Sequence, residues 1–345
     1  MIKLNYISHG PQVTGGYLHE KNLAEKLSKA LAIELHELRQ WQYFENLQAH
    51  VKLLHWAFKM SDAELNICVS RLALPSILKN IFSNRKTLVV WHYFDEKDKK
   101  SKFLKTYYQI LVRISLFIPS KKLAFIAVAP YWKSYFEKEF KLKKVFYFPN
   151  LFQPNLYEKF IGSSKKKQIH LGQVSFKNSA ELFYLAEQLF VRGYFCYFST
   201  NDPKKVYESA YYKVIYFNNH DEYLQHMAES EYTLAMPAIE EGWNRIAHES
   251  LLVGTQVIGF NKGGLGDLLR GSNAFMIGSR PINNQIEHFK TREFGNNTMP
   301  PPTVVNAMYL ILNQIQAPIN RPFLDQFNDN KAPEFIAPIC DWYST

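Results

Sequence analysis

Residues 232–269 read YTLAMPAIEEGWNRIAHESLLVGTQVIGFNKGGLGDLL, and the order of elements within them decides the fold. An apolar strand ends before a loop that carries Glu241, and a helix that carries Glu249 runs to a stop at Gly254. A second apolar strand then leads into the glycine-rich stretch 263–266. Strand, loop, helix, strand and glycine-rich loop in this order predict one repeat of a parallel α/β sheet.

The spacing of the two glutamates indicates a ligand site rather than a solvated helix face. A pair of glutamates alone is typical of a solvated face, and Glu240 is expected to be such a surface charge. Eight residues along a helix give a rise of about 12 Å and a rotation of about 80°, so Glu241 and Glu249 can reach opposite ends of one elongated ligand. The first amides of the helix, expected near Gly242 and Trp243, have no partner within the helix and favour an anion such as a diphosphate.

The same alternation of strands and helices extends through the chain and predicts two Rossmann-like α/β domains. Helices are expected, among others, at 101–118 and 203–210. Two X-Pro steps interrupt the pattern after residue 148, which predicts a linker between the domains. The expected domains and connecting segments are 1–150, a linker at 151–155, 156–320, and a tail at 321–345 that packs back on the first domain.

The bulk composition predicts a cytosolic protein whose first half binds an anionic partner. Residues 1–150 hold 24 Lys plus Arg and 12 Asp plus Glu, whereas residues 151–345 hold 17 and 19. The net charge of +12 in the first half suits phospholipid headgroups, a phosphorylated acceptor or nucleic acid. Three widely separated cysteines fit a reducing compartment. No signal peptide and no apolar run of about 18 residues is present, which predicts a protein without a membrane span.

Together these features resemble the retaining GT-B glycosyltransferases, in particular glycosyltransferase family 4. The donor-domain pattern of that family has a proline, a Glu-Gly pair, a second glutamate after seven intervening residues, a strand and a Gly-Gly pair. The matching positions here are Pro237, Glu241-Gly242-Trp243-Asn244, Glu249-Ser250, the stretch 254–260 and Gly263-Gly264. Four further stretches resemble family elements: YISHGPQVTGGYLHEKNLAEKL (6–27), VVWHYFD (89–95), VFYFPN (145–150) and IHLGQVSFKN (169–178).

The resemblance implies that two Rossmann-like domains face one another across a cleft, and it implies roles for residues at the matching positions. Glu249 would bind the ribose hydroxyls of a nucleotide sugar, and Glu241 would hold the transferred sugar. His92 would contact the sugar or the leaving phosphate, and Lys177 would stabilise the charge on the departing nucleoside diphosphate. The other donor-binding positions are Gly15, Gly16, Gly242, Trp243, Asn244 and Arg245.

Three positions depart from the family pattern. Gln173 replaces a basic residue, so Arg245 is a candidate for the missing phosphate-binding cation, with an ordinary ion pair as the alternative. Trp243 and Asn244 replace Phe-Gly, so the sugar pocket is expected to be narrower. The chain has no Asp-x-Asp motif, which fits a metal-independent reaction without a cofactor.

A basic and aromatic stretch at 95–122 predicts attachment to an anionic membrane surface or to the acceptor. The alternative is a core helix flanked by solvated lysines. The basic residues of this predicted patch are Lys97, Lys99, Lys100, Lys102, Lys105, Lys121 and Lys122.

These interpretations lead to one expected function and two alternatives. We expect a glycosyltransferase that moves a hexose-type sugar from a nucleoside diphosphate donor to an acceptor hydroxyl with retention. Its acceptor would be a glycan or a lipid-linked molecule in surface glycan, lipopolysaccharide or glycolipid assembly, at the inner face of the cytoplasmic membrane. A nucleotide-sugar epimerase or a nucleic-acid glucosyltransferase on the same fold is one alternative. A basic nucleic-acid-binding protein without catalysis is the other, and carboxylates in the predicted site disfavour nucleic acid as a partner.

Overall fold

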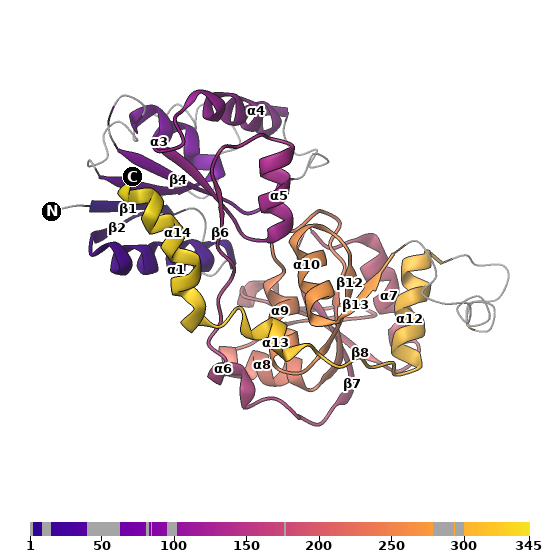
Figure 1. The fold of residues 1–345 in the computed structure, drawn as a ribbon. Coiled ribbons are helices and arrows are strands. Elements are labelled where there is room, and N and C mark those ends of the chain that lie inside the picture. Colours follow the sequence, from indigo (N-terminus) through magenta and orange to yellow (C-terminus); the bar gives the residue numbers. More distant parts are fainter. Residues whose placement is uncertain are drawn as a thin grey trace. The chain divides into compact units, whose positions relative to one another are not determined.

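The computed structural model describes residues 3–8, 15–39, 63–80, 83, 85–94, 102–175, 177–278, 293 and 300–345. The chain divides into two compact units (Figure 1). Unit 1 comprises Met1–Leu151 and Asp329–Thr345, and unit 2 comprises Phe152–Asn328. The sequence predicts a linker at 151–155 and an end of the second domain at 320, and these boundaries stay predictions.

Unit 1 is built on a parallel sheet of six strands in the order β2-β1-β3-β4-β5-β6. The strands are β1 (Lys3–Ser8), β2 (Glu34–Arg39), β3 (Leu65–Val69), β4 (Lys86–Trp91), β5 (Leu123–Ala127) and β6 (Val145–Tyr147). Every residue of β3 and β5 is buried, because helices cover both faces of a parallel sheet and leave no solvated side. The strand order reverses between β1 and β3, and ligands of open α/β sheets bind at such a reversal.

The helices of unit 1 come from both ends of the chain. They are α1 (Gly15–Leu31), α3 (Ala73–Asn80), α4 (Lys102–Phe117), α5 (Pro130–Lys138) and α14 (Ala332–Ser344). Helix α14 lies beside α1 (Figure 1) and adds Ala332, Ile336, Ile339 and Trp342 to the core of the unit. The Trp342 indole also donates a hydrogen bond to the Ser120 carbonyl oxygen at 2.7 Å. The last helix of the chain is therefore part of the N-terminal core.

Unit 2 is built on a sheet of seven strands in the order β13-β12-β11-β7-β8-β10-β9. Its strands are β7 (Lys166–Gln173), β8 (Phe195–Thr200), β9 (Tyr207–Glu208), β10 (Lys213–Tyr216), β11 (Ser230–Ala235), β12 (Gln256–Phe260) and β13 (Phe275–Ile277). All described pairs are parallel except β9 with β10. Here the strand order reverses between β7 and β11.

The helices of unit 2 cover this sheet and form two apolar clusters with it. They are α6 (Asn155–Glu158), α7 (Ala180–Phe190), α8 (His220–Ala228), α9 (Arg245–Leu252), α10 (Gly263–Ser272), α12 (Pro302–Leu312) and α13 (Arg321–Asp325). The predicted helix at 203–210 is wrong. A single 3-10 turn, Pro203–Lys205, is followed by edge strand β9, because Tyr207 pairs with Val214 of β10.

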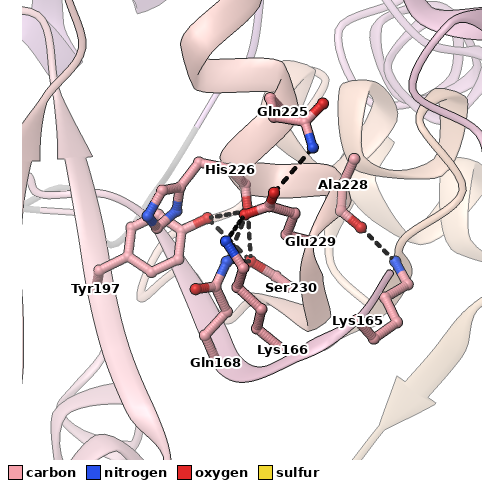
Figure 2. Close-up of polar contacts among 9 residues, drawn as sticks. All are labelled: Lys165, Lys166, Gln168, Tyr197, Gln225, His226, Ala228, Glu229 and Ser230. Carbon is pink, nitrogen blue, oxygen red and sulfur yellow. Dashed lines mark hydrogen bonds and ion pairs between the residues drawn. The ribbon is translucent and has the colours of Figure 1, made fainter. Parts of the chain in front are cut away.

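Polar side chains at the amino-terminal edge of the second sheet hold the end of α8 (Figure 2). Lys165 donates to the Ala228 carbonyl oxygen at 2.7 Å, and Lys166 forms an ion pair with Glu229. Positive charge near the last carbonyls of a helix is favourable because the helix dipole is negative there. Gln168 and Tyr197 donate to the His226 carbonyl oxygen at 2.9 and 3.3 Å. This polar cluster therefore has a structural role, at the edge of the sheet opposite to the predicted site.

Candidate functional site

In unit 2 the predicted site residues follow the two strands at which the strand order reverses. Lys177 follows β7 and Glu241 follows β11. The Lys177 ammonium lies 3.7 Å from Glu241 Oε1, and the Lys177 carbonyl accepts a hydrogen bond from the Ala238 amide. The structure thus brings together two residues that are 64 positions apart, at the point where this type of sheet binds ligands.

Asn244 fixes both the start of α9 and the Glu241 side chain. It is the N-cap residue, and its side-chain oxygen accepts from the Ala247 amide at 2.8 Å. Its amide nitrogen donates to Glu241 Oε2 at 2.7 Å. The helix starts at Arg245, as the sequence predicts, and the amides of Gly242 and Trp243 that were expected at its start lie in the loop before it. Because Asn244 caps the Ala247 amide, the first-turn N–H groups left for an anion are those of Arg245 and Ile246.

Glu241 is also tied through its backbone to the start of α10. The Gly264 amide donates to the Glu241 carbonyl oxygen at 3.0 Å. Gly263 has φ of +53°, and a Cβ atom there would lie 2.4 Å from that carbonyl oxygen. Only glycine allows this close approach without a shift of the backbone. The predicted glycine-rich loop is thus the first turn of α10, and it supports the loop that carries Glu241.

Glu249 lies buried on α9 within a set of hydrogen-bond donors. Arg245 Nε donates to Glu249 Oε1 at 2.9 Å, the Tyr157 hydroxyl lies 3.4 Å from the same oxygen, and His220 Nε2 lies 3.6 Å from it. Burial acts to raise the pKa of Glu249, but the contacts with His220 and Arg245 outweigh it, so the pKa is lowered and the carboxylate stays ionised. Arg245 thus forms an ion pair with Glu249 through Nε.

Trp243 forms part of an aromatic wall beneath this site. Its indole N–H donates to His248 Nδ1 at 3.1 Å, and its ring lies 5.0 Å from that of Phe327. Burial lowers the pKa of His248 to about 3, so this ring is a neutral acceptor at neutral pH. Gly242 is buried next to this wall. The Trp243 side chain is thereby fixed within unit 2.

In unit 1 the predicted residues follow β1 and β4. Gly15 and Gly16 are the first residues of α1, and His92 directly follows β4. His92 Nε2 lies 2.7 Å from Oε1 of Glu20, a fully buried carboxylate on α1. His19, which precedes Glu20 on α1, is buried, and its Nε2 lies 2.8 Å from the Phe148 carbonyl oxygen.

The structure shows a different orientation of α4 from the one that the predicted basic and aromatic patch requires. Lys97, Lys99 and Lys100, and the side chain of Lys102, lie outside the described residues, while Lys105 and Lys121 are exposed and Lys122 is half-buried. One side of α4 matches the alternative of a core helix. Tyr107 and Leu111 point into the core, and the Tyr108 ring stacks on Trp91 at 5.3 Å. Among the described side chains of α4, the exposed large apolar ones are Ile110, at 43%, and Phe117, at 87%.

Four site residues were not found by the sequence reasoning: Glu20, Tyr157, His220 and Lys262. Lys262 precedes α10 and donates to the Pro237 carbonyl oxygen at 3.2 Å, so it lies beside the loop that carries Glu241. His220 begins α8, the helix that follows β10, so its place after a parallel strand was the available signal. Glu20 and Tyr157 contact residues 72 and 92 positions away, and no local pattern reports such a pairing.

Within the described ranges, no group of three or more His, Cys, Asp or Glu side chains is placed to hold a metal ion. No helix in those ranges is long and apolar enough to cross a lipid bilayer.

Two α/β units with largely parallel sheets, and a last helix that packs on the first unit, define the fold class as GT-B. In searches by sequence, no family description and no characterised protein matches the chain. Solved structures do match over nearly the whole length. Anabaena HepE in complex with UDP-glucose is 16% identical, with 99% of this chain and 100% of that chain covered and a TM-score of 0.62. Sucrose-phosphate synthase from Thermosynechococcus elongatus is 12% identical, with 98% and 100% covered and a TM-score of 0.62. A glycosyltransferase from Rickettsia africae is 14% identical, with 97% and 98% covered and a TM-score of 0.55.

Proposed function

We propose that the protein is a glycosyltransferase that moves a hexose-type sugar from a nucleoside diphosphate donor to an acceptor hydroxyl, with retention of configuration. One observation carries the proposal: Glu241, Lys177 and the start of α9 meet where the strand order of unit 2 reverses, with Glu249 about one turn further along α9. The HepE structures, which contain UDP or UDP-glucose on the same fold, support a uridine nucleotide as the donor's carrier.

Glu249 is the proposed ribose contact. Its Oε1 is occupied by Arg245, with His220 and Tyr157 close by, which leaves Oε2 to accept from a ribose hydroxyl. The carboxylate is ionised and held in one position, so it accepts without a loss of side-chain freedom. A charge-assisted hydrogen bond of this kind contributes about 1.5–3 kcal/mol.

The diphosphate would lie near the first turn of α9, with cations around it. Lys177 and Lys262 supply positive charge, and the helix dipole adds about half a charge. Arg245 donates to Glu249 through Nε, so its terminal guanidinium nitrogens can still reach a phosphate while the ion pair persists. These groups would stabilise the departing nucleoside diphosphate. The proposed reaction therefore uses no metal ion and no cofactor, and the nucleoside diphosphate sugar is its donor substrate.

Glu241 and His92 are the proposed contacts of the transferred sugar. Asn244 and Lys177 hold the Glu241 carboxylate, so it would accept from sugar hydroxyls in one fixed orientation. His92 would contact the sugar or the leaving phosphate. Gly15 and Gly16, at the start of α1, would let backbone amides approach the diphosphate.

We also propose that the acceptor is a glycan or a lipid-linked molecule at the inner face of the cytoplasmic membrane. The outer face of α4 exposes Ile110 and Phe117 together with Lys105 and Arg113, and Lys121 follows the helix. Apolar side chains between cations suit the headgroup region of an anionic bilayer, where each basic residue contributes about 1 kcal/mol.

A panel of nucleotide sugars, read by thermal shift and by release of the nucleoside diphosphate, tests the donor site. UDP-glucose is expected to raise the melting temperature of the parent protein and not that of Glu249→Ala. The control is Glu208→Ala, which removes an exposed carboxylate of β9. An equal shift in all three proteins would contradict the ribose contact. Nuclear magnetic resonance of the transferred sugar would report retention or inversion directly.

A further inference from the structure

Unit 1 contains a buried carboxylate to which the proposed function assigns no role. Glu20 lies in the second turn of α1 and has no solvent exposure. Removal of an ionised carboxylate from water costs several kcal/mol unless hydrogen bonds and charge compensate for it. The residues that compensate for Glu20 therefore indicate what it does.

Both oxygens of Glu20 have donors. His92 Nε2 lies 2.7 Å from Oε1, and the Tyr6 hydroxyl donates to Oε2 at 3.1 Å. A carboxylate only accepts, so His92 Nε2 carries the hydrogen in this contact. Burial, and then the charge of Glu20, raise the pKa of Tyr6 far above its usual range, so this phenol remains a donor. The pair thus fixes both the orientation of the imidazole and the nitrogen that holds the proton.

His92 differs from the structural histidines of the chain in its exposure and in its place. Its side chain is 22% exposed, whereas Glu20 is fully covered. His19 and His248 are both buried, and each bonds to a neighbour within its own core. His92 stands at the carboxyl end of β4, the edge of the sheet where α/β proteins bind ligands. The imidazole is therefore the side of the pair that a ligand can reach.

We propose that Glu20 is a positioning residue that acts through His92. This inference rests on the proposed function, in which His92 contacts the transferred sugar or the leaving diphosphate. Glu20 holds the ring with Nε2–H toward itself and so fixes the orientation of the imidazole at the end of β4. The same division of tasks lets a buried carboxylate orient a histidine in other enzymes.

A double-mutant cycle with UDP-glucose as the donor tests the pairing. Glu20→Gln is expected to lower kcat for release of UDP by about 10- to 100-fold and to leave KM within about two-fold. His92→Ala is expected to cause a similar loss, and the double variant no further loss. Glu20→Asp should recover part of the rate. The matched control is Glu25→Gln, an exposed carboxylate of the same helix, which should equal the parent. Additive losses, or a Glu20→Gln rate equal to that of the control, would overturn the inference.

Two further measurements separate this inference from the proposed function. Binding of UDP should be unchanged in Glu20→Gln and lost in Glu249→Ala. If the parent releases no UDP from UDP-glucose, the proposed donor is wrong, and nitrogen-15 spectra of His92 then decide the pairing. The parent should show the Nε2-protonated ring, and Glu20→Gln should show a changed tautomer distribution; an unchanged one would overturn the pairing. Tyr6→Phe, which keeps the ring and removes one donor to Glu20, serves as a second variant if Glu20→Gln does not fold.

Discussion

Replacement of Arg245 by methionine should destabilise unit 2 through the charge that it leaves behind. Arg245 is 30% exposed and holds Glu249, whose side chain is 6% exposed. Methionine retains an unbranched stem of similar length over the Phe152 ring, where the guanidinium carbon now lies 5.2 Å from the ring centre. The substitution therefore removes the positive charge and keeps much of the packing.

The magnitude follows from the burial of the pair. Loss of one partner of a fully buried ion pair costs about 3–5 kcal/mol. The partial exposure of Arg245 and the nearby His220, 3.6 Å from Glu249, reduce the expected cost to about 2–3 kcal/mol. For a unit of this size, each kcal/mol lowers the melting temperature by about 2–4 °C. Scanning calorimetry should therefore show the unit 2 transition lowered by roughly 5–10 °C.

The pH dependence identifies the cause. In the parent the pKa of Glu249 is lowered, because His220 and Arg245 outweigh the effect of burial. A carboxyl group with a lowered pKa contributes stability above its unfolded pKa of about 4.3, and the contribution is lost as the pH falls through the folded value. Without Arg245, burial dominates and the pKa of Glu249 rises. The difference between parent and variant should therefore be largest near pH 7 and small near pH 3.

An exposed ion pair of the same unit provides the control. Lys213→Met removes the partner of Glu208, a pair in which the side chains are 46% and 66% exposed. Such pairs contribute up to about 1 kcal/mol. The reasoning is refuted if Arg245→Met costs no more than Lys213→Met, or if its cost is the same at pH 7 and pH 3.

Three other substitutions test separate parts of the structure. Gly263→Ala would place a Cβ atom 2.4 Å from the Glu241 carbonyl oxygen. It should therefore lower the free energy of unfolding by at least about 2 kcal/mol and weaken UDP binding. Gly278→Ala, whose Cβ atom would meet nothing within 4 Å, should change neither quantity. Burial lowers the pKa of His170 to about 3. Between about pH 6.5 and pH 3 the unfolded chain therefore binds a proton at this residue that the folded chain does not, so the free energy of unfolding falls as the pH falls. In denaturant titrations, His170→Gln should make this pH dependence shallower by about 1.4 kcal/mol per pH unit. Phe117→Ser should reduce co-sedimentation with vesicles that contain phosphatidylglycerol, whereas Val191→Ser, at an exposed apolar residue of unit 2, should not; equal binding by both variants, or no binding by the parent at low salt, would contradict the membrane proposal.

The alternation of strands and helices was predictable because buried parallel strands have an unmistakable composition. β3 and β5 are short apolar runs, and both are buried at every position. The predicted helix at 203–210 is wrong, although the charged and polar residues of PKKVYESA are typical of an exposed helix. There the pairing of Tyr207 with Val214 decides the conformation, and such pairing across an edge is not visible along the chain.

For α4 the sequence predicts the helix and leaves two interpretations open, a membrane or acceptor patch and a core helix flanked by lysines. Tyr107, Leu111, Ser115 and Ile118 are buried and follow a helical period. The patch interpretation rests on composition alone, without regard to that period. Phe117 departs from the period and is exposed. A count by helical face would therefore have assigned Tyr107 to the core and left Phe117 outside.

For the site, the sequence indicated which residues lie at the ends of strands but not which of them meet. Glu241 and Glu249 were identified because they lie within one strand-helix unit. Lys177 and His220 reach them from the ends of β7 and β10, since the carboxyl ends of parallel strands share one edge of the sheet. The same rule applied to unit 1 selects the residues that follow β1 and β4. These residues include the start of α1 and His92. Glu20, the buried carboxylate of α1, contacts His92.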